Sequence, residues 1–248
     1  MQMEDQATVN SRPMDNKKIL VVLPHPDDEA YFVSGTLAMY IEEGAEVTYA
    51  CLTLGEMGRN MGVPLIANRV TLPVIRKEEL AASCQAIGIQ DLRMLGFHDK
   101  MIEFEDPDLL DSQIMKLIQE LAPSLVITFY PGYSVHPDHD ATGAAVIRTI
   151  ARLPLTERPV VHCSAFSNNH EKMIGKADVT IDVTSFLAVK IKSILSHSSQ
   201  FQADKLLGGR DITDDIIRSK FGIERFWTYS FEEHDTTKRI GELLCAQT

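Results

Sequence analysis

Two short clusters of imidazole and carboxylate side chains stand out in the chain. The first is Pro24-His-Pro-Asp-Asp-Glu29, and the second is His136-Pro-Asp-His139. The acids of the first cluster could serve a helix N-terminus, where negative charge is favoured, but capping needs only one acceptor. Two imidazoles and one carboxylate with an open coordination position form the ligand set of a hydrolytic zinc site. The repeated His-Pro-Asp sequence therefore favours a metal centre over a capped loop.

Both clusters follow apolar segments that are typical of buried strands. Residues 19–23 are a branched, uninterrupted apolar run, which suits a strand buried on both faces of a parallel sheet, and residues 124–130 resemble it. Helical patterns follow over residues 30–43 and 141–152. Ligand sites in open α/β sheets lie beyond the carboxyl ends of the strands. We therefore expect one edge of one sheet to bring the two clusters together.

The same alternation of strands and helices continues through the rest of the chain. Further strands are predicted at 46–52, 92–95, 159–166, 179–183 and 224–231, the last as an edge strand, and further helices at 74–87, before Leu121, at 185–195 and within 201–222. The glycine-containing stretch from Thr53 to Leu72 leaves the same sheet edge and is interpreted as a wall of the site. We expect a flexible tail over residues 1–17 and a single α/β domain over residues 18–248.

Composition excludes several classes of function. A net charge of −11 and a pI near 5.2 disfavour nucleic acid and anionic membrane surfaces as partners, and no run approaches the roughly 20 apolar residues of a membrane span. The N-terminal residues lack the apolar core of a secretory signal. The four cysteines are scattered, which favours buried thiols and a cytoplasmic, soluble protein.

The clusters together resemble the zinc-dependent N-acetylglucosaminyl deacetylases of the PIG-L/LmbE type. The similarity spans roughly residues 18–230, and the segment Thr128-Phe-Tyr-Pro-Gly-Tyr-Ser-Val-His136 is most similar to the bacillithiol-biosynthesis deacetylases of bacilli. Further matching motifs are Thr53-Leu-Gly-Glu-Met-Gly58, Arg76-Lys-Glu-Glu-Leu80, Leu95-Gly-Phe-His-Asp99 and His197-Ser-Ser-Gln200. The resemblance implies a three-layer Rossmann-like fold with a mostly parallel central sheet flanked by helices. It also implies assembly into a homo-oligomer.

The resemblance implies a metal site made by His25, Asp28 and His139. Zn²⁺ is the expected cofactor, with Fe²⁺ as an alternative in the cell, and the ion would lower the pKa of a bound water from about 15.7 towards 7. Asp27 is then the candidate general base. Which of the two neighbouring aspartates binds the metal follows from the resemblance alone, because the spacing does not distinguish them.

The remaining catalytic candidates lie in the second cluster. His136 is expected to donate to the oxyanion or to protonate the leaving amine, and Asp138 is expected to orient His136. One departure from the family is Ser134, which stands where related actinobacterial enzymes have a mobile tyrosine. Whether the neighbouring Tyr133 substitutes for it is open.

Five further residues match positions that the family places at the substrate pocket or lie beside such positions. They are Arg76, Asp99, Glu56, Arg59 and His197. For His197, a helix C-cap is an equally good interpretation. For Arg76, a solvated surface charge is the commoner role, although the helix dipole disfavours a cation near a helix N-terminus.

The expected reaction is removal of the acetyl group from an N-acetylglucosaminyl conjugate, with N-acetylglucosaminyl malate as the expected substrate. Amide cleavage of bacillithiol S-conjugates and deacetylation of another small N-acetylglucosamine compound are the alternatives. An Fe(II) oxygenase could use the same ligand set but typically has an all-β fold. A nucleotide-binding module would need a phosphate-binding glycine motif, which Gly55, Gly58 and Gly62 do not form.

Overall fold

A computed structural model of the chain describes residues 16–231. Most of the predicted tail therefore lies outside the described residues, as do positions 232–248 of the predicted domain. Asn16 donates its backbone N–H to the Gly44 carbonyl, and the Lys17 carbonyl accepts from the Glu46 amide at 2.8 Å. The chain thus joins the folded part already at residue 16.

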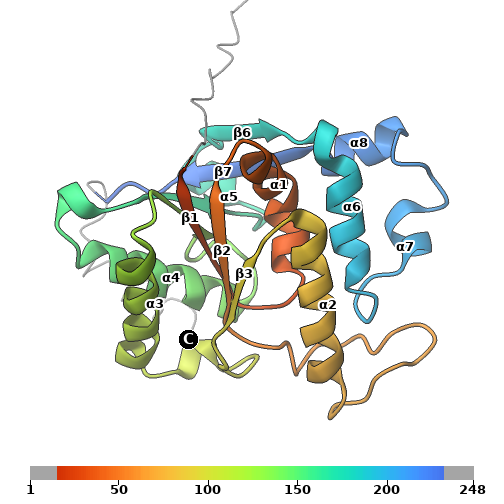
Figure 1. Cartoon of the computed structure of the whole chain (residues 1–248), viewed down its shortest axis with the longest axis horizontal. Helices are drawn as coiled ribbons and strands as arrows, with labels where there is room; N and C mark the ends of the chain where they lie inside the picture. The colour runs from red at the N-terminus through yellow and green to blue at the C-terminus, as the bar shows by residue number, and fades with distance from the viewer. Residues whose placement is uncertain (1–15, 232–248) are drawn as a thin grey trace, which may run out of the picture.

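One sheet organises the described part of the chain (Figure 1). Its strands are β1 (Lys18–Leu23), β2 (Glu46–Cys51), β3 (Asp91–Met94), β4 (Leu125–Phe129), β5 (Val160–Ser164), β6 (Val179–Asp182) and β7 (Ile223–Thr228). The strand order is β3-β2-β1-β4-β5-β7-β6, with β1 to β5 parallel and β7 antiparallel to both of its neighbours. The prediction of a mostly parallel sheet is confirmed. The prediction of β7 as an edge strand is wrong, because β6 pairs with its outer side.

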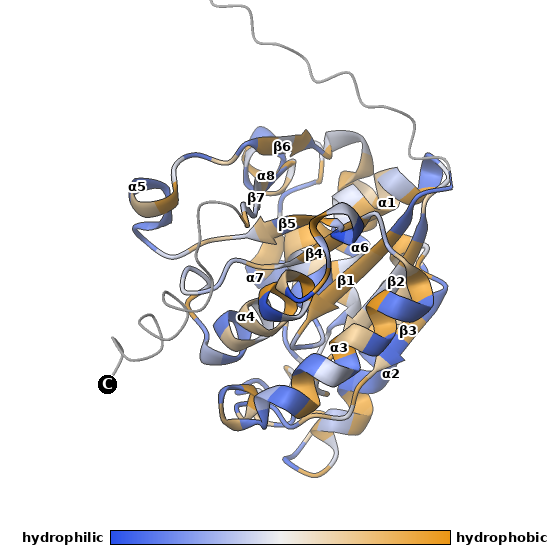
Figure 2. Cartoon of the chain, turned by 90° about the vertical axis from the view of Figure 1, so that its left-hand side faces the viewer, coloured by the Kyte–Doolittle hydropathy of each residue, from blue (hydrophilic) through white to orange (hydrophobic). Residues whose placement is uncertain are grey.

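Helices cover both faces of the sheet and complete three layers. The helices are α1 (Ser34–Glu42), α2 (Leu72–Ile87), α3 (Pro107–Leu121), α4 (Pro137–Ala151), α5 (His170–Ile174), α6 (Leu187–Ser196), α7 (Ala203–Leu207) and α8 (Asp215–Phe221). In Figure 1, α3 and α4 lie on one side of the sheet and α1, α2 and α6 on the other. Figure 2 shows apolar residues concentrated on the strands between these layers.

Strand β1 lies at the centre of the core, as its apolar run predicts. Ile19, Val21 and Leu23 pack in the cluster that includes residues of α1 and α2, whereas Leu20 and Val22 pack in the cluster that includes residues of α3 and α4. All five are at most 1% exposed. Burial on both faces explains why the run does not alternate with polar residues.

Strands β2 and β3 are added on one side of β1, and strands β4 and β5 on the other side. Strand β1 pairs with β2 on one side and with β4 on the other, so the loops after β1 and β4 leave in opposite directions and open a crevice between them. Helix α4 lies very close to β4, because a Cβ added at Gly143 would meet the Phe129 carbonyl oxygen at 2.2 Å. The crevice at the carboxyl ends of β1 and β4 is where both His-Pro-Asp sequences lie.

Candidate active site

The first cluster connects β1 to a short π-helical turn over Glu29–Val33, which precedes α1. The sequence pattern predicted an ordinary helix from residue 30; π-helical turns are rare and often lie at functional sites. Asp28 stands at the N-cap position, yet its side chain makes no capping hydrogen bond and instead accepts from the His25 backbone amide at 2.9 Å. Helix capping therefore does not explain this carboxylate.

The second cluster forms the start of α4. The helix begins at Pro137, four residues earlier than predicted, and His136 is its N-cap, with Nδ1 accepting from the Asp138 backbone amide at 3.1 Å. His139 thus lies in the first helical turn instead of in a loop. A helix that packs tightly on β4 holds these side chains more rigidly than a loop would.

Donor atoms of three residues from the two clusters form a compact triangle, with the two carboxylate oxygens of Asp28 together making one corner. His25 Nδ1 lies 3.2 Å from His139 Nε2 and 3.4 Å from Asp28 Oδ2, and His139 Nε2 lies 3.2 Å from Asp28 Oδ1. A tetrahedral ion with ligands at 2.0–2.2 Å separates neighbouring ligand atoms by about 3.3–3.6 Å. All three residues are less than 9% exposed. The triangle therefore fits a metal ion with one position left for solvent or substrate.

The other ring nitrogen of each histidine has a partner that orients the ring. His25 Nε2 lies 3.0 Å from Asp138 Oδ2 and 3.2 Å from Asp99 Oδ1, and His139 Nδ1 lies 3.1 Å from the Ser134 carbonyl oxygen. Metal-binding histidines usually donate their second N–H to a carboxylate or a carbonyl. In this pattern the lone pairs of His25 Nδ1 and His139 Nε2 are available to bind an ion.

Two other groups of donor atoms overlap with the triangle. The ligand atoms of His25, His136 and His139 lie within 4.8 Å of one another, and so do those of His25, Asp99 and Asp138. Asp138 also accepts from the Lys100 amide at 2.7 Å, so its carboxylate already has donors. The residues present can hold a metal ion, and among these three groups the triangle combines two imidazoles with one carboxylate.

The charges at the triangle favour a cation. Burial raises the pKa of Asp28, but the charge and hydrogen bonds of His139 and His25 outweigh it and hold that pKa well below its usual value. Burial lowers the pKa of His25, but contacts with Asp138, Asp28 and Asp99 outweigh it and raise that pKa. The same acidic surroundings would stabilise a metal ion beside a neutral His25.

Asp27 has an unusual backbone conformation, and its carboxylate contacts Arg76. Its φ is +108°, a region that side chains rarely adopt, and its Oδ2 lies 2.9 Å from Nη2 of Arg76. Burial raises the pKa of Asp27 to about 6, with a contribution from the neighbouring charge of Asp28, while Arg76 opposes the rise. Asp27 lines the cavity and does not belong to the triangle. A carboxylate with this environment can accept a proton near neutral pH.

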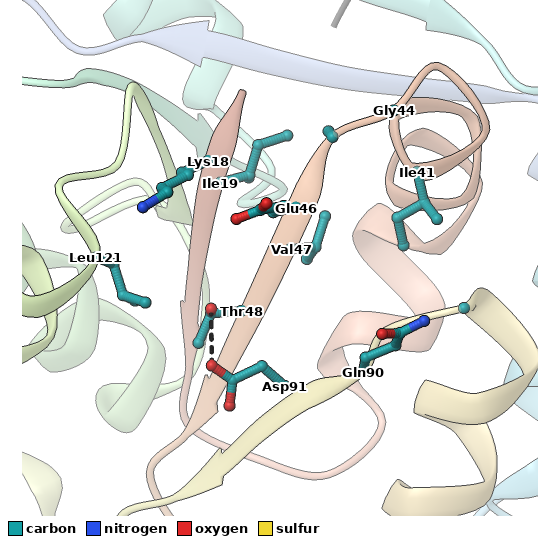
Figure 3. A pocket seen from close by; sticks show the side chains of 12 residues that line it. Lys18, Ile19, Ile41, Gly44, Glu46, Val47, Thr48, Gln90, Asp91 and Leu121 are labelled. Carbon is teal, nitrogen blue, oxygen red and sulfur yellow. Dashed lines mark hydrogen bonds between the residues drawn. The ribbon is translucent and has the colours of Figure 1, made fainter. Parts of the chain in front are cut away.

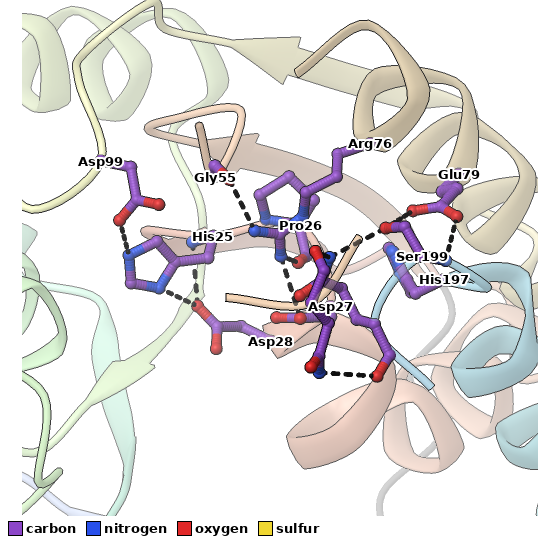
Figure 4. Close-up of polar contacts among 12 residues, drawn as sticks. His25, Pro26, Asp27, Asp28, Gly55, Arg76, Glu79, Asp99, His197 and Ser199 are labelled. Atoms are coloured by element: carbon purple, nitrogen blue, oxygen red, sulfur yellow. Dashed lines mark hydrogen bonds and ion pairs between the residues drawn. The ribbon is translucent and has the colours of Figure 1, made fainter. Parts of the chain in front are cut away.

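Helix α2 carries a buried polar face directed at the site (Figure 4). Arg76 donates to the carbonyl oxygens of Gly55 and Pro26 as well as to Asp27, and it is 3% exposed. Glu79 accepts from the Ser199 amide at 2.6 Å. The helix thus holds the Asp27 loop and the segment after α6 together. Arg76 is buried and paired, so it is not a solvated surface charge.

His136 lines the cavity at half-buried depth. Burial lowers its pKa, and the charges of His25 and His139 lower it further, which favours the neutral ring. Because Nδ1 accepts a hydrogen bond, the neutral ring carries its proton on Nε2. The expected contact between the Asp138 carboxylate and His136 is not what the structure describes. The carboxylate contacts His25, since its position in the first turn of α4 faces that ring.

A cavity of about 440 Å³ opens above these residues. Its lining comprises His25, Asp27, Asp28, Met57, Gly58, Arg59, Arg76, Asp99, Lys100, His136, His139 and Gln200. The predicted wall from Thr53 to Leu72 contributes three of them. Four lining residues were not among the predicted site residues: Met57, Gly58, Lys100 and Gln200. Gln200 nevertheless belongs to the matching motif His197-Ser-Ser-Gln200.

Two predicted substrate residues lie behind the cavity wall. His197 is 0% exposed and contacts Glu29, and it is not among the residues that line the cavity; Gln200 of the same motif is. Burial lowers the pKa of His197, but the charge and hydrogen bond of Glu29 outweigh it and raise that pKa. Glu56 accepts from the Asp99 amide at 3.1 Å and positions that residue.

Tyr133 is not among the residues that line the cavity. Its ring packs against Tyr130 at 5.6 Å between centroids, next to the core. Ser134 is buried, and its hydroxyl donates to the Tyr130 carbonyl at 3.0 Å. Ser134 contributes to the site through its backbone carbonyl, which holds His139.

A second cavity of about 440 Å³ lies at the opposite edge, near the amino ends of β1, β2 and β3 (Figure 3). Lys18, Glu46, Thr48 and Asp91 are among its lining residues, and Thr48 donates to Asp91 at 3.1 Å. The lining contains no histidine or cysteine. The cavity at the carboxyl edge is therefore the candidate active site.

Comparison with known proteins agrees with this geometry. Residues 20–150 match the PIG-L family, described as GlcNAc-PI de-N-acetylase. The matched segment contains both clusters and all three residues of the triangle. The chain belongs to the PIG-L family. The predicted membership, and with it the prediction of a deacetylase, is confirmed.

Similar PIG-L proteins include two from bacilli. A Bacillus cereus protein named probable N-acetyl-alpha-D-glucosaminyl L-malate deacetylase 2 is 48% identical over 87% of this chain and 99% of its own length. A Bacillus subtilis protein of the same name is 44% identical over 87% of this chain and 98% of its own. The similarity to these relatives thus covers far more of the chain than the matched family segment.

Among solved structures, an N,N'-diacetylchitobiose deacetylase from Pyrococcus horikoshii has a TM-score of 0.70. It shares 24% sequence identity, and the match covers 91% of this chain and 89% of that one. The likeness confirms the Rossmann-like fold of this PIG-L protein. None of the helices within residues 16–231 combines the length and apolar character needed to cross a bilayer.

Proposed function

We propose that this PIG-L protein hydrolyses the N-acetyl group of N-acetylglucosaminyl malate, releasing acetate and a free amine, as a step of bacillithiol biosynthesis. The observation that carries the proposal is the triangle of His25 Nδ1, Asp28 and His139 Nε2, with sides of 3.2–3.4 Å, beside the carboxylate of Asp27. The two Bacillus proteins named for this activity support the choice of substrate, because the similarity to this chain covers almost their whole length.

We propose Zn²⁺ as the ion, with Fe²⁺ as the alternative in the cell, because two imidazoles and one carboxylate in tetrahedral spacing suit zinc. Zn²⁺ held there supplies Lewis acidity, which activates water and polarises an amide carbonyl. The Asp27 carboxylate accepts the proton that the attacking water loses and can pass it to the leaving amine. His136 donates from Nε2–H to the oxygen that becomes negative. Asp99 and Asp138 keep the His25 ring in place.

The mouth of the cavity suits an anionic substituent on the sugar. Arg59 and Lys100 line the cavity, are exposed, and make no ion pair within residues 16–231. The interior below them carries the carboxylates of Asp27, Asp28 and Asp99. Malate has two carboxylates, and these can pair with the two cations while the acetamido group reaches the triangle.

Assembly and compartment complete the proposal. We propose a homo-oligomer, since Val63, Leu65 and Val70 are 68–82% exposed in one loop beside the cavity, and exposed apolar groups often mark contacts between proteins. Cys51 and Cys163 are buried, free and inside strands, as the sequence predicted. Free buried thiols fit the reducing cytoplasm. Light scattering on the purified full chain measures the assembly.

The test is to incubate zinc-loaded protein with N-acetylglucosaminyl malate, free N-acetylglucosamine and a bacillithiol S-conjugate, and to quantify the primary amine released. We expect the malate conjugate to react with the highest kcat/KM, and the His139→Ala variant to release none. Faster cleavage of the S-conjugate would replace the proposal with the amidase alternative. No amine from any of the three substrates would overturn it.

A further inference from the structure

Glu29 is a fully buried acid with four donors around its carboxylate. Oε1 accepts from the Ser83 hydroxyl at 2.5 Å and from His197 Nε2 at 2.7 Å. Oε2 accepts from the Asp27 backbone amide at 3.0 Å and from the Tyr49 hydroxyl at 3.4 Å. With 0% exposure, Glu29 cannot touch a substrate in the cavity. Its carboxylate acts only through the groups that it holds.

The contact with Asp27 has the clearest consequence for the site. Asp27 has a φ of +108°, which costs about 1–3 kcal/mol for a residue with a side chain and persists only where surrounding contacts enforce it. Two contacts do so on opposite sides of the residue. Glu29 holds the backbone amide, and Arg76 holds the carboxylate and the preceding Pro26 carbonyl.

Glu29 is itself anchored to two distant helices. Ser83 lies on α2 and also contacts Ser193 of α6 at 2.7 Å between hydroxyl oxygens, and His197 follows the end of α6. Both are 0% exposed, as is Glu29. Figure 4 shows His197 beside the Asp27 loop. The Glu29 carboxylate thus connects the contact between α2 and α6 to the backbone of Asp27.

We propose that Glu29, backed by His197, is a positioning residue that fixes the strained backbone of Asp27 and so aims the general base at the reacting water. The inference rests on the proposed function, because it assigns Asp27 the role of base. Glu29 has no side-chain contact with His25, Asp28 or His139 among those described, so its effect should fall on turnover and leave metal binding intact. A pocket role for His197 predicts a change in KM instead.

The experiment compares Glu29→Gln with the matched control Glu224→Gln in the zinc-loaded full chain. Glu224 is likewise a buried acid, 3% exposed, but it contacts Lys190 and the start of α1, away from the cavity. We measure kcat and KM for N-acetylglucosaminyl malate, zinc per chain and Tm. Glu29→Gln should lower kcat by about 10–100-fold, since an ångström of misplacement can cost about 100-fold, with KM and zinc content within twofold of wild type. Glu224→Gln should lower Tm and leave kcat within twofold.

A double-mutant cycle distinguishes positioning of Asp27 from a general structural role. In the Asp27→Asn background, Glu29→Gln should change the residual kcat by less than twofold, because the base on which it acts is already absent. An equal loss of kcat in both backgrounds, a loss of zinc, or an unchanged kcat in the single variant would overturn the proposal.

If Glu29→Gln does not fold, the His197→Gln variant tests the positioning role. It should lower kcat in the same direction without raising KM, and a raised KM with unchanged kcat would return His197 to substrate binding. Failure of the proposed function gives a separate result. In that case wild-type protein releases no amine from any of the three substrates, whereas failure of the positioning role leaves wild-type turnover intact.

Discussion

The Arg76 guanidinium lies 2.9 Å from the carboxylate of Asp27, the residue immediately before the proposed ligand Asp28. Arg76 is 3% exposed, and its remaining contacts are the carbonyl oxygens of Gly55 and Pro26. A buried cation with these contacts serves the proposed base directly. It explains how an arginine near the start of α2 is tolerated where the helix dipole disfavours it.

The first prediction concerns the pH dependence that this pair creates. Burial raises the pKa of Asp27 to about 6, and the charge of Arg76 opposes the rise. Removing the charge in Arg76→Gln should raise the pKa of Asp27 further. Because the base must be ionised, the acidic limb of the kcat/KM profile should move to higher pH. Arg76→Lys keeps a charge and should shift the limb less; a limb that moves to lower pH in Arg76→Gln would contradict the assignment of Asp27.

The second prediction separates the base from the metal ligands. Asp27→Ala should keep zinc and lose about 10²–10⁴-fold in kcat, which is the usual contribution of a general base. His139→Ala should lose the metal, because one side of the triangle disappears. Metal analysis of both purified variants, with Asp28→Ala alongside, measures this. Zinc lost from Asp27→Ala but retained in Asp28→Ala would reverse the two roles.

The third prediction tests the cations at the mouth of the cavity. Arg59→Gln and Lys100→Gln should each raise KM for N-acetylglucosaminyl malate by about 3–10-fold, since an exposed ion pair contributes up to about 1 kcal/mol and a charged hydrogen bond somewhat more. The KM for a neutral N-acetylglucosaminide should stay within twofold. Initial-rate kinetics on the two substrates decide it, and an equal increase for both would show that the cations do not recognise the malate.

The fourth prediction concerns stability. Lys190 forms a buried ion pair with Glu224, whose carboxylate also accepts from the amides of Gly35 and Thr36 at the start of α1. Lys190→Met leaves this carboxylate without its counter-charge, which should cost about 3 kcal/mol and lower Tm by roughly 6–12 °C. Lys192→Met, two residues along the same helix and exposed, should shift Tm by less than about 2 °C. Calorimetry that finds equal shifts for the two variants would contradict the role of the pair.

Local patterns in the sequence were sufficient for the strands, for most helices and for the choice of the two clusters. Residues 19–23 predict a strand buried on both faces because their hydrophobicity is itself a local property, and two His-Pro-Asp sequences after two such strands meet at the sheet edge because parallel strands share that edge. The predicted helix over residues 74–87 ends where α2 ends, because Gly88 follows it with a φ of +102°, which glycine adopts readily.

Contacts between distant residues could be decided only by the tertiary structure. Glu29 and His197 are 168 positions apart, and nothing near either one indicates that a helix end will bring an imidazole to this carboxylate. The partner of Asp138 is His25 and not His136, because the first turn of α4 turns the carboxylate away from its neighbour in sequence. Strand β7 lies inside the sheet because a later strand can insert between earlier ones. Residue types and spacing therefore determined which chemistry this protein carries, whereas the packing of helices across the sheet decided which atom of each side chain faces which partner, since orientation depends on neighbours that the local sequence does not contain.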